Sequence, residues 1–277
     1  MTRTTRTTRT ADKATPVTEA LTDPLAHAQA DPLAAQLSAH LGALNLPFML
    51  EHHHGLAQTA AQKHWSHIDY LNELVTGEAA CRADRTVKRR IALARFPVIK
   101  TLDQFDWNWP TKINRAQIQH LFHLDFVANK GNVVLVSGTG LGKTHLLTAL
   151  GMAACRGGHS VLFTGAIDII NTVGCARAAG NIKQALNRYI TPAVLLIDEL
   201  GYLPIDKFGA DCLFQIISHR YERGSTLITS NRIYKHWPEI FNNDSVLTAA
   251  LLDRLLHHAE TIRIEGKSYR MKDQIEA

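Results

Sequence analysis

A stretch near the middle of the chain, residues 137–144, has the residue types and the spacing of a phosphate-binding loop. Its glycines let the backbone curl so that successive N–H groups point at phosphate oxygens, and the helix expected after it adds a partial positive charge. We expect Lys143 to reach the β- and γ-phosphates and Thr144 to bind Mg²⁺. The stretch therefore predicts ATP binding, with contacts from Ser137, Gly138, Thr139, Gly140, Leu141, Gly142, Lys143 and Thr144.

The first position of this loop departs from the usual pattern, because Ser137 stands where such loops have glycine. A small residue suffices at the exit of a strand if its φ is negative. An apolar run from Asn132 precedes the loop, and a helical stretch, residues 145–155, follows it. This setting favours a nucleotide site over the alternative, a glycine-rich turn without a ligand.

Two acidic residues, Asp198 and Glu199, end a second apolar run that begins at Val194. Carboxylates at the carboxyl end of a buried strand are costly unless they bind a cation or activate water. We predict that Asp198 binds Mg²⁺ together with Thr144, and that Glu199 polarises the water that attacks ATP. A lone Asp would more often cap a helix, but the phosphate-binding loop makes hydrolysis the better interpretation.

Asn231 follows a third apolar run, residues 226–230. By itself an Asn at the end of a strand is most often a turn residue. Its place in the order of strands favours a second role, in which it orients the water between Glu199 and the γ-phosphate.

Five short runs rich in β-branched residues are expected to form the sheet that positions these side chains. They are NVVLVS from Asn132, SVLFT from Ser160, AVLLID from Ala193, STLITS from Ser225 and TIRIE from Thr261. Strands that alternate with helical stretches form mainly parallel sheets covered on both faces. In the order of the sequence, one run, that from Ser160, lies between the loop strand and the acidic strand. This order is similar to the additional-strand, catalytic-Glu division of P-loop proteins. Asn231 narrows the prediction to an α/β fold with an AAA+ P-loop NTPase core of five parallel strands.

The length of 277 residues predicts two unequal domains. Residues 1–31 are poor in large apolar side chains and begin with Arg and Thr repeats, which predicts a flexible basic tail. Residues 32–95 carry apolar residues at helical spacing and predict a small all-helical domain. Residues 96–277 are predicted to form the ATPase domain, which starts with an irregular connector that contains prolines.

The composition, 45% hydrophobic and 20% charged, excludes global disorder, and the net charge of +5 makes nucleic acid a candidate partner. Residues 82–100 hold seven basic residues against the single acid Asp84, which fits a solvated helix face and a phosphate-contacting face equally. The four cysteines form no C-x-x-C pair, and no apolar run nears the roughly 20 residues needed to cross a membrane. We therefore expect a cytoplasmic protein without membrane association. No Cys or acidic cluster accompanies His52, His53 and His54, so no metal besides Mg²⁺ is predicted.

Four phrases of the sequence closely resemble IstB, the helper ATPase of insertion-sequence transposition. They are GTGLGKTHL from Gly138, LLIDELGYLP from Leu195, ITSNR from Ile228 and LLDRLLHHAETIRIEGKSYR from Leu251. The resemblance covers roughly residues 33–270, and it extends to helicase loaders of the DnaC type and to the initiator DnaA. It implies ATP-dependent self-assembly on double-stranded DNA and cooperation with a transposase encoded by the same element.

The resemblance also implies roles for residues outside the phosphate loop. Arg254 looks like the arginine that enters the ATP site of a neighbouring subunit, where it would neutralise transition-state charge. An insertion, residues 166–192, corresponds to a segment that contacts the nucleic-acid backbone, with Arg177, Lys183 and Arg188 as the candidate contacts. Phe105, with Asp106 and Trp107, lies where related proteins cover the adenine, although packing between the domains is an equal alternative. Arg270 is the candidate for a second sensor arginine.

Three other functions are compatible with the same motifs. A helicase loader would bind a hexameric helicase through its N-terminal domain, and a metabolic P-loop kinase would phosphorylate a small molecule. A nucleotide-dependent binding module would turn ATP over negligibly. Glu199 and the absence of an evident acceptor pocket argue against the kinase.

Overall fold

The computed structural model describes residues 32–271, and the predicted basic tail, residues 1–31, lies outside the described residues. The chain divides into two compact units, Met1–Glu78 and Ala79–Ala277. The division falls inside a long helix, α3 (His67–Ala94), whereas the boundary predicted from the sequence lies where this helix ends. No described helix has both the length and the apolar character that a membrane span requires.

The first unit is helical, as predicted. It contains α1 (Pro32–Ala43), α2 (Pro47–Lys63) and the first part of α3. Glu78 of α3 is 4% exposed, and its Oε2 accepts hydrogen bonds from the N–H groups of Phe48 (2.9 Å) and Met49 (3.3 Å). These are N–H groups of the first turn of α2, which have no partner within that helix. The buried carboxylate of Glu78 therefore caps α2 and fixes it against α3.

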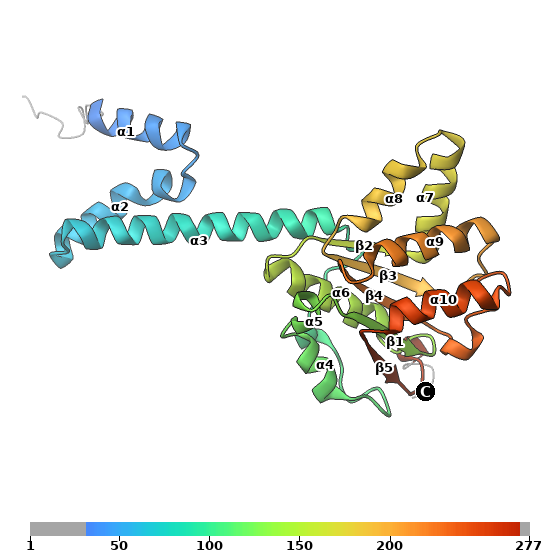
Figure 1. Cartoon of the computed structure of the whole chain (residues 1–277). Coiled ribbons are helices and arrows are strands. Elements are labelled where there is room, and N and C mark those ends of the chain that lie inside the picture. Colours follow the sequence, from blue (N-terminus) through green and yellow to red (C-terminus); the bar gives the residue numbers. More distant parts are fainter. Residues whose placement is uncertain (1–31, 272–277) are drawn as a thin grey trace, which may run out of the picture. The chain divides into compact units, whose positions relative to one another are not determined.

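The second unit is built on a five-stranded sheet in which all neighbouring strands are parallel (Figure 1). The strands are β1 (Asn132–Ser137), β2 (Val161–Gly165), β3 (Val194–Leu200), β4 (Ser225–Ser230) and β5 (Ala259–Ile264). Their spatial order is β2-β3-β4-β1-β5, so that β4 lies between the loop strand and the acidic strand. This order confirms the predicted AAA+ core with its additional strand.

Helices cover both faces of the sheet because successive side chains of its strands point to opposite sides. Val133 and Leu135 of β1 belong to a core shared with α6 (Lys143–Arg156), α4 (Arg115–Leu121) and α5 (Asp125–Ala128). Val134 and Val136 belong to the core on the other face, beneath α7 (Ala166–Ala178), α8 (Ile182–Ile190), α9 (Lys207–Arg220) and α10 (Ser245–Leu256). Short 3₁₀ segments are η1 (Leu102–Gln104), η2 (Tyr234–His236) and η3 (Tyr269–Met271).

Arg220, at the end of α9, is buried to 2% exposure and acts as a structural connector. Its guanidinium donates to the Thr226 hydroxyl and to the carbonyl oxygens of residues 189, 190, 192, 193 and 225, at 2.6–3.3 Å. Burial lowers the pKa of Arg220 to about 10. One side chain thus ties the end of α8 and the start of β3 to β4.

We predict that Arg220→Met lowers the free energy of unfolding by about 3 kcal/mol or more, because the change strands several buried carbonyl oxygens. Urea denaturation followed by circular dichroism measures this loss. The exposed neighbour Arg223 offers a control, since Arg223→Met is expected to change stability by less than about 0.5 kcal/mol. Equal effects of the two substitutions would contradict the connecting role of Arg220.

Candidate nucleotide site

A cavity of about 400 Å³ opens at the carboxyl edge of the sheet, above β1, β3 and β4. Ligands of open α/β sheets bind at this edge. The wall of the cavity is formed by the loop before α6, the ends of two strands, the connector before α4 and the last described residues. The residues that line it include Phe105, Asp106, Trp109, residues 139–145, Glu199, Thr229, Asn231, Tyr269 and Arg270.

The phosphate-binding loop needs glycine for two physical reasons. Gly140 (φ +74°) and Gly142 (φ +83°) have the left-handed backbone that L side chains rarely adopt. A Cβ on Gly142 would also lie 2.6 Å from Cε2 of Phe105, and one on Gly140 would lie 2.1 Å from Oγ of Ser268. Ser137 is instead the last residue of β1, where the backbone is extended and φ is negative. The condition under which serine replaces the first glycine is therefore met.

Lys143 is the first residue of α6, and its ammonium group is held against the loop that precedes it. Nζ donates to the carbonyl oxygens of Ser137 (3.0 Å) and Gly138 (2.6 Å) and to Oγ of Ser137 (3.1 Å). Burial lowers the pKa of Lys143, while the charge of Asp198 acts in the opposite direction. A half-buried cation at a helix N-terminus is an arrangement that attracts phosphate.

Asp198 is 7% exposed and is bound by two hydroxyl groups from different elements. Thr144 Oγ1 donates to Oδ2 at 2.9 Å, and Thr229 Oγ1 of β4 donates to Oδ1 at 2.5 Å. The hydroxyl of Thr144 and the carboxylate of Asp198 form an oxygen donor pair at the mouth of the loop. Mg²⁺ prefers oxygen ligands and is usually bound by one or two protein groups together with phosphates and water, so this pair fits it.

Glu199 has an unusual backbone conformation, with φ +60°, at a register shift between β3 and β4. Its N–H donates to Oγ1 of Thr229 at 2.8 Å, and its side chain is exposed and lines the cavity. A left-handed backbone at a non-glycine residue is costly, so the surrounding structure must hold Glu199 in this conformation. Asn231 lines the same cavity from the end of β4, so the structure brings both predicted residues together with Lys143.

Thr229 was not identified from the sequence, although it contacts both acidic residues. The only available signal was a hydroxyl residue inside the apolar run of β4, two positions before Asn231. Its importance depends on the pairing of β4 beside β3, with Ile197 opposite Ile228. Thr229 positions the acidic pair, because its single hydroxyl group donates to one residue and accepts from the other.

Aromatic residues close the other end of the cavity. Phe105 lies at its base, 7% exposed, in edge contact with Trp107 and His145. Phe105 and Asp106 line the cavity as expected, but Trp107 is not among the lining residues, and its ring packs against Arg115. Trp109 lines the cavity in its place.

The segment after β5 folds back over the phosphate-binding loop. The N–H of Tyr269 donates to the carbonyl oxygen of Gly140 at 2.9 Å, and Trp109 Nε1 donates to that of Lys267 at 2.8 Å. This segment places Arg270 in the cavity wall, where its charge contributes to the lowered pKa of Lys143. Trp109 and Tyr269, which were not identified from the sequence, are in edge contact, with ring centroids 5.4 Å apart.

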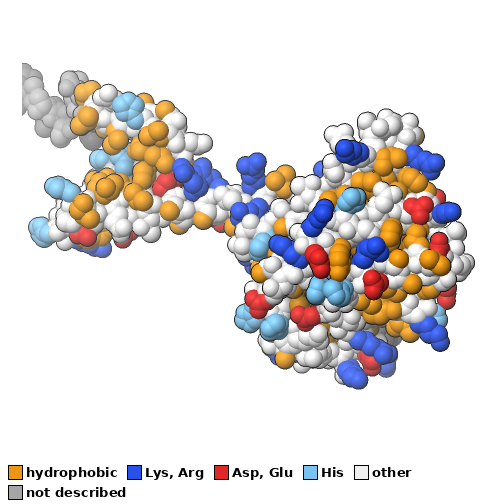
Figure 2. Space-filling view, in the orientation of Figure 1, with side chains coloured by type: hydrophobic (Ala, Val, Ile, Leu, Met, Phe, Trp, Pro, Cys, Tyr) orange, Lys and Arg blue, Asp and Glu red, His pale blue; other side chains and the backbone are white. Residues whose placement is uncertain are grey.

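The remaining predicted residues lie away from the cavity wall. Arg254 of α10 packs over the ring of Phe214 at 5.0 Å and donates to the carbonyl oxygen of Ala250. Arg177 of α7 lies over the Phe208 ring at 4.6 Å, and Lys183 and Arg188 are exposed on α8. Figure 2 shows Lys and Arg side chains over this helical hairpin. One chain by itself therefore does not bring Arg254 to its own ATP site.

Comparison with known proteins gives the family. The family described as IstB-like ATP binding protein matches residues 39–277. The chain is 36% identical over 231 residues to the ATP-binding protein of insertion sequence IS5376 from Geobacillus stearothermophilus, covering 83% of this chain and 92% of that protein. It is 37% identical over 242 residues to the corresponding protein of IS21 from Pseudomonas aeruginosa, covering 87% and 91%.

Solved structures share the fold at lower identity. The replication initiator DnaA, bound to AMPPCP and single-stranded DNA, is 20% identical with a TM-score of 0.52, and the match covers 66% of this chain and 56% of DnaA. The DnaC helicase loader is 22% identical with a TM-score of 0.50, and the match covers 60% of this chain and 96% of that one. These likenesses support the AAA+ assignment of the core.

We predict that Lys143→Ala abolishes ATP binding, because it removes the cation that the loop holds at the phosphate position. Isothermal titration with a non-hydrolysable ATP analogue measures the affinity. Lys235→Ala, a change at an exposed lysine that is not part of the cavity wall, is expected to bind as the unaltered protein does. Equal affinity in the two variants would refute the site.

The conformation of Glu199 gives a second prediction. Because φ is positive there, Glu199→Gly is expected to be more stable than Glu199→Ala by about 1 kcal/mol. The opposite order is expected at Ala249, an exposed position of α10, where Ala249→Gly costs about 1 kcal/mol. Thermal denaturation of the three variants tests this, and a Glu199→Ala variant as stable as Glu199→Gly would contradict the strained geometry.

Proposed function

The chain belongs to the family of IstB-like ATP-binding proteins, and from this membership we propose that it is an ATPase that assembles on double-stranded DNA and assists a transposase. The proposal has three parts, which are hydrolysis of ATP, completion of the site by a second subunit, and contact with the DNA backbone. The central observation is the convergence of Lys143, Thr144 and Glu199 on one cavity, with Asp198 hydrogen-bonded to Thr144 beside it.

Hydrolysis follows from the roles that these side chains can take. Lys143 binds the β- and γ-phosphates. Glu199 accepts a hydrogen bond from the attacking water and polarises it, and Asn231 orients the same water. Thr144 and Asp198 would hold Mg²⁺, which supplies positive charge beside the phosphates when bound. Thr229 positions the backbone of Glu199 and the carboxylate of Asp198 through its hydroxyl group.

The position of Arg254 supports completion of the site by a second subunit. Phosphoryl transfer is accelerated by an arginine that neutralises charge on the γ-phosphate in the transition state. Arg254 lies on α10, outside the cavity wall of its own chain, and is only half-buried. We assign it to the ATP site of the adjacent subunit, which makes hydrolysis dependent on assembly.

DNA contact is assigned to the hairpin of α7 and α8. Arg177, Lys183 and Arg188 are exposed on it and carry positive charge into solvent. Arg177 and Arg188 rest on aromatic rings, which leaves the guanidinium groups open to an anion on the other side. Contacts of this kind go to phosphates and carry little sequence information.

A helicase loader is the second candidate, because the core also matches the DnaC fold. The two curated relatives described above favour the transposition role for this chain, since both are proteins of insertion sequences. Retention of the chain on immobilised replicative helicase, and not on transposase, would reverse this choice.

The test of the proposal mixes two variants. Glu199→Gln is expected to bind ATP without hydrolysing it, and Arg254→Ala is expected to lose roughly a thousandfold in ATP turnover. In an equal mixture, about one interface in four joins an intact site to an intact arginine, so activity returns in part. Steady-state phosphate release with duplex DNA measures this recovery.

A control variant and two possible outcomes complete this test. Arg223→Ala serves as the control, since this exposed arginine is outside the cavity wall and should leave turnover unchanged. If both variants are inactive alone and the mixture gains nothing, Arg254 does not act on a neighbour. Full activity of Arg254→Ala alone would remove its role altogether.

A further inference from the structure

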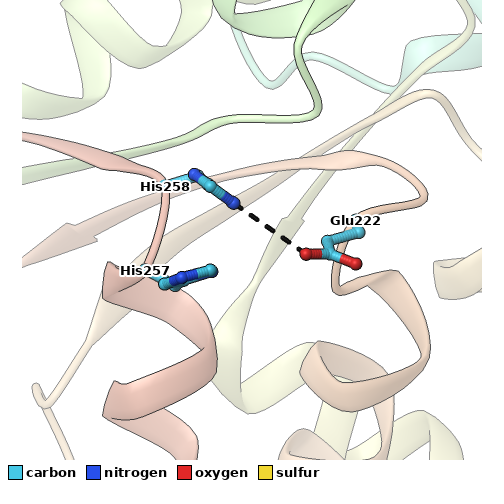
Figure 3. Close-up of side chains that lie close together, drawn as sticks. All are labelled: Glu222, His257 and His258. Carbon is cyan, nitrogen blue, oxygen red and sulfur yellow. Dashed lines mark ion pairs between the residues drawn. The ribbon is translucent and has the colours of Figure 1, made fainter.

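Three side chains with metal-binding groups come together at the edge of the sheet opposite the nucleotide cavity. Glu222 lies in the turn between α9 and β4, and His257 and His258 join α10 to β5 (Figure 3). These two turns flank the start of β1, whose Asn132 N–H donates to the carbonyl oxygen of His258 at 2.7 Å. Among residues 32–271 this is the one group of three such side chains close enough to share an ion.

The ligand atoms of the three side chains all lie within 4.8 Å of one another. Nε2 of His258 is 3.9 Å from Oε1 of Glu222, and the two imidazole centroids are 4.1 Å apart. In a tetrahedral zinc site, bond lengths of about 2.0–2.2 Å place the ligand atoms about 3.4 Å apart. All three side chains are exposed, so a rotation that moves the ligand atoms by about 1 Å completes the geometry.

The chemistry of the donors selects the ion. Two imidazoles and one carboxylate are a ligand set that zinc uses when one coordination position stays open for water. Imidazole nitrogen suits zinc and is a poor ligand for Mg²⁺, which takes oxygen. The donor set of this cluster therefore differs in kind from the Thr144 and Asp198 pair at the nucleotide site.

A residue beside the cluster forms a hydrogen bond with the imidazole of His257. The hydroxyl of Tyr221 lies 2.8 Å from Nδ1 of His257. Metal-bound histidines usually have such a partner on the ring nitrogen that does not bind the metal, because it fixes the tautomer and the ring orientation.

We propose that Glu222, His257 and His258 form a zinc-binding site with an open position for water. An ion here would join the turn after α9 to the end of α10. Arg254 lies in the last turn of α10, and His257 is the residue that directly follows this helix. If the proposed function holds, the ion would therefore stiffen the helix that carries Arg254, but zinc binding itself depends on neither ATP nor DNA.

The test measures zinc binding by the full chain without an affinity tag, in the absence of nucleotide and DNA. Titration against a chromophoric zinc chelator gives the affinity and the number of ions. Replacement of zinc by Co²⁺ adds the visible absorption of a tetrahedral site. We expect one ion to be lost, or its affinity to fall by at least about a hundredfold, in the His257→Gln/His258→Gln variant and in Glu222→Gln.

The chain has 15 histidines, so control variants are needed to show which of them bind the ion. His120→Gln/His123→Gln alters another exposed pair, with ring centroids 5.9 Å apart, and is expected to leave zinc binding unchanged. Circular dichroism establishes that each variant is folded. Unchanged zinc affinity in His257→Gln/His258→Gln would overturn the proposal. So would loss of the ion on substitution of His52, His53 and His54 instead, or the absence of micromolar zinc binding in the unaltered protein.

Discussion

The buried carboxylate of Asp198 is the interaction on which the nucleotide site depends. At 7% exposure it is largely removed from water, and burial of a carboxylate is costly unless hydrogen bonds or a cation compensate it. Thr144 from the start of α6 and Thr229 from β4 supply two hydroxyl groups. These contacts require β3, β4 and β1 to end at the same edge in the observed order, so the parallel pairing of the sheet and the chemistry of the site are linked.

Strain and close packing around this carboxylate follow from the same arrangement. The register shift after Ile197 turns the backbone of Glu199 into a left-handed conformation, which sends its side chain to the cavity instead of the core. Gly140 and Gly142 accept the close approach of Ser268 and Phe105. The cavity is thus lined by segments from both ends of the second unit. We propose that Arg254 of a neighbouring chain supplies the charge that a single chain does not place there.

Much of this site could be predicted from the sequence, because the loop and the acidic pair are short local patterns attached to strands. The five strands, the additional strand and the small all-helical region were predicted for the same reason. Thr229, Trp109 and Tyr269 could not be, because their relevance comes from strand pairing and from a chain segment that returns after more than 100 residues. Trp107 was expected either to cover the adenine or to pack between the domains. It does not line the cavity, whereas Trp109 does, because only the fold decides which tryptophan of the connector faces the cavity. The zinc cluster has no sequence signal, since Glu222 is 35 residues before His257.

The claim that the ATP site is completed between subunits on DNA is tested most directly by electron microscopy of the full chain. The protein would be imaged with duplex DNA and a non-hydrolysable ATP analogue, and again with DNA alone. The account predicts oligomers on DNA only when the nucleotide is present, with Arg254 of one subunit at the cavity of the next. Monomers in both conditions, or oligomers in which Arg254 lies remote from every cavity, would contradict it.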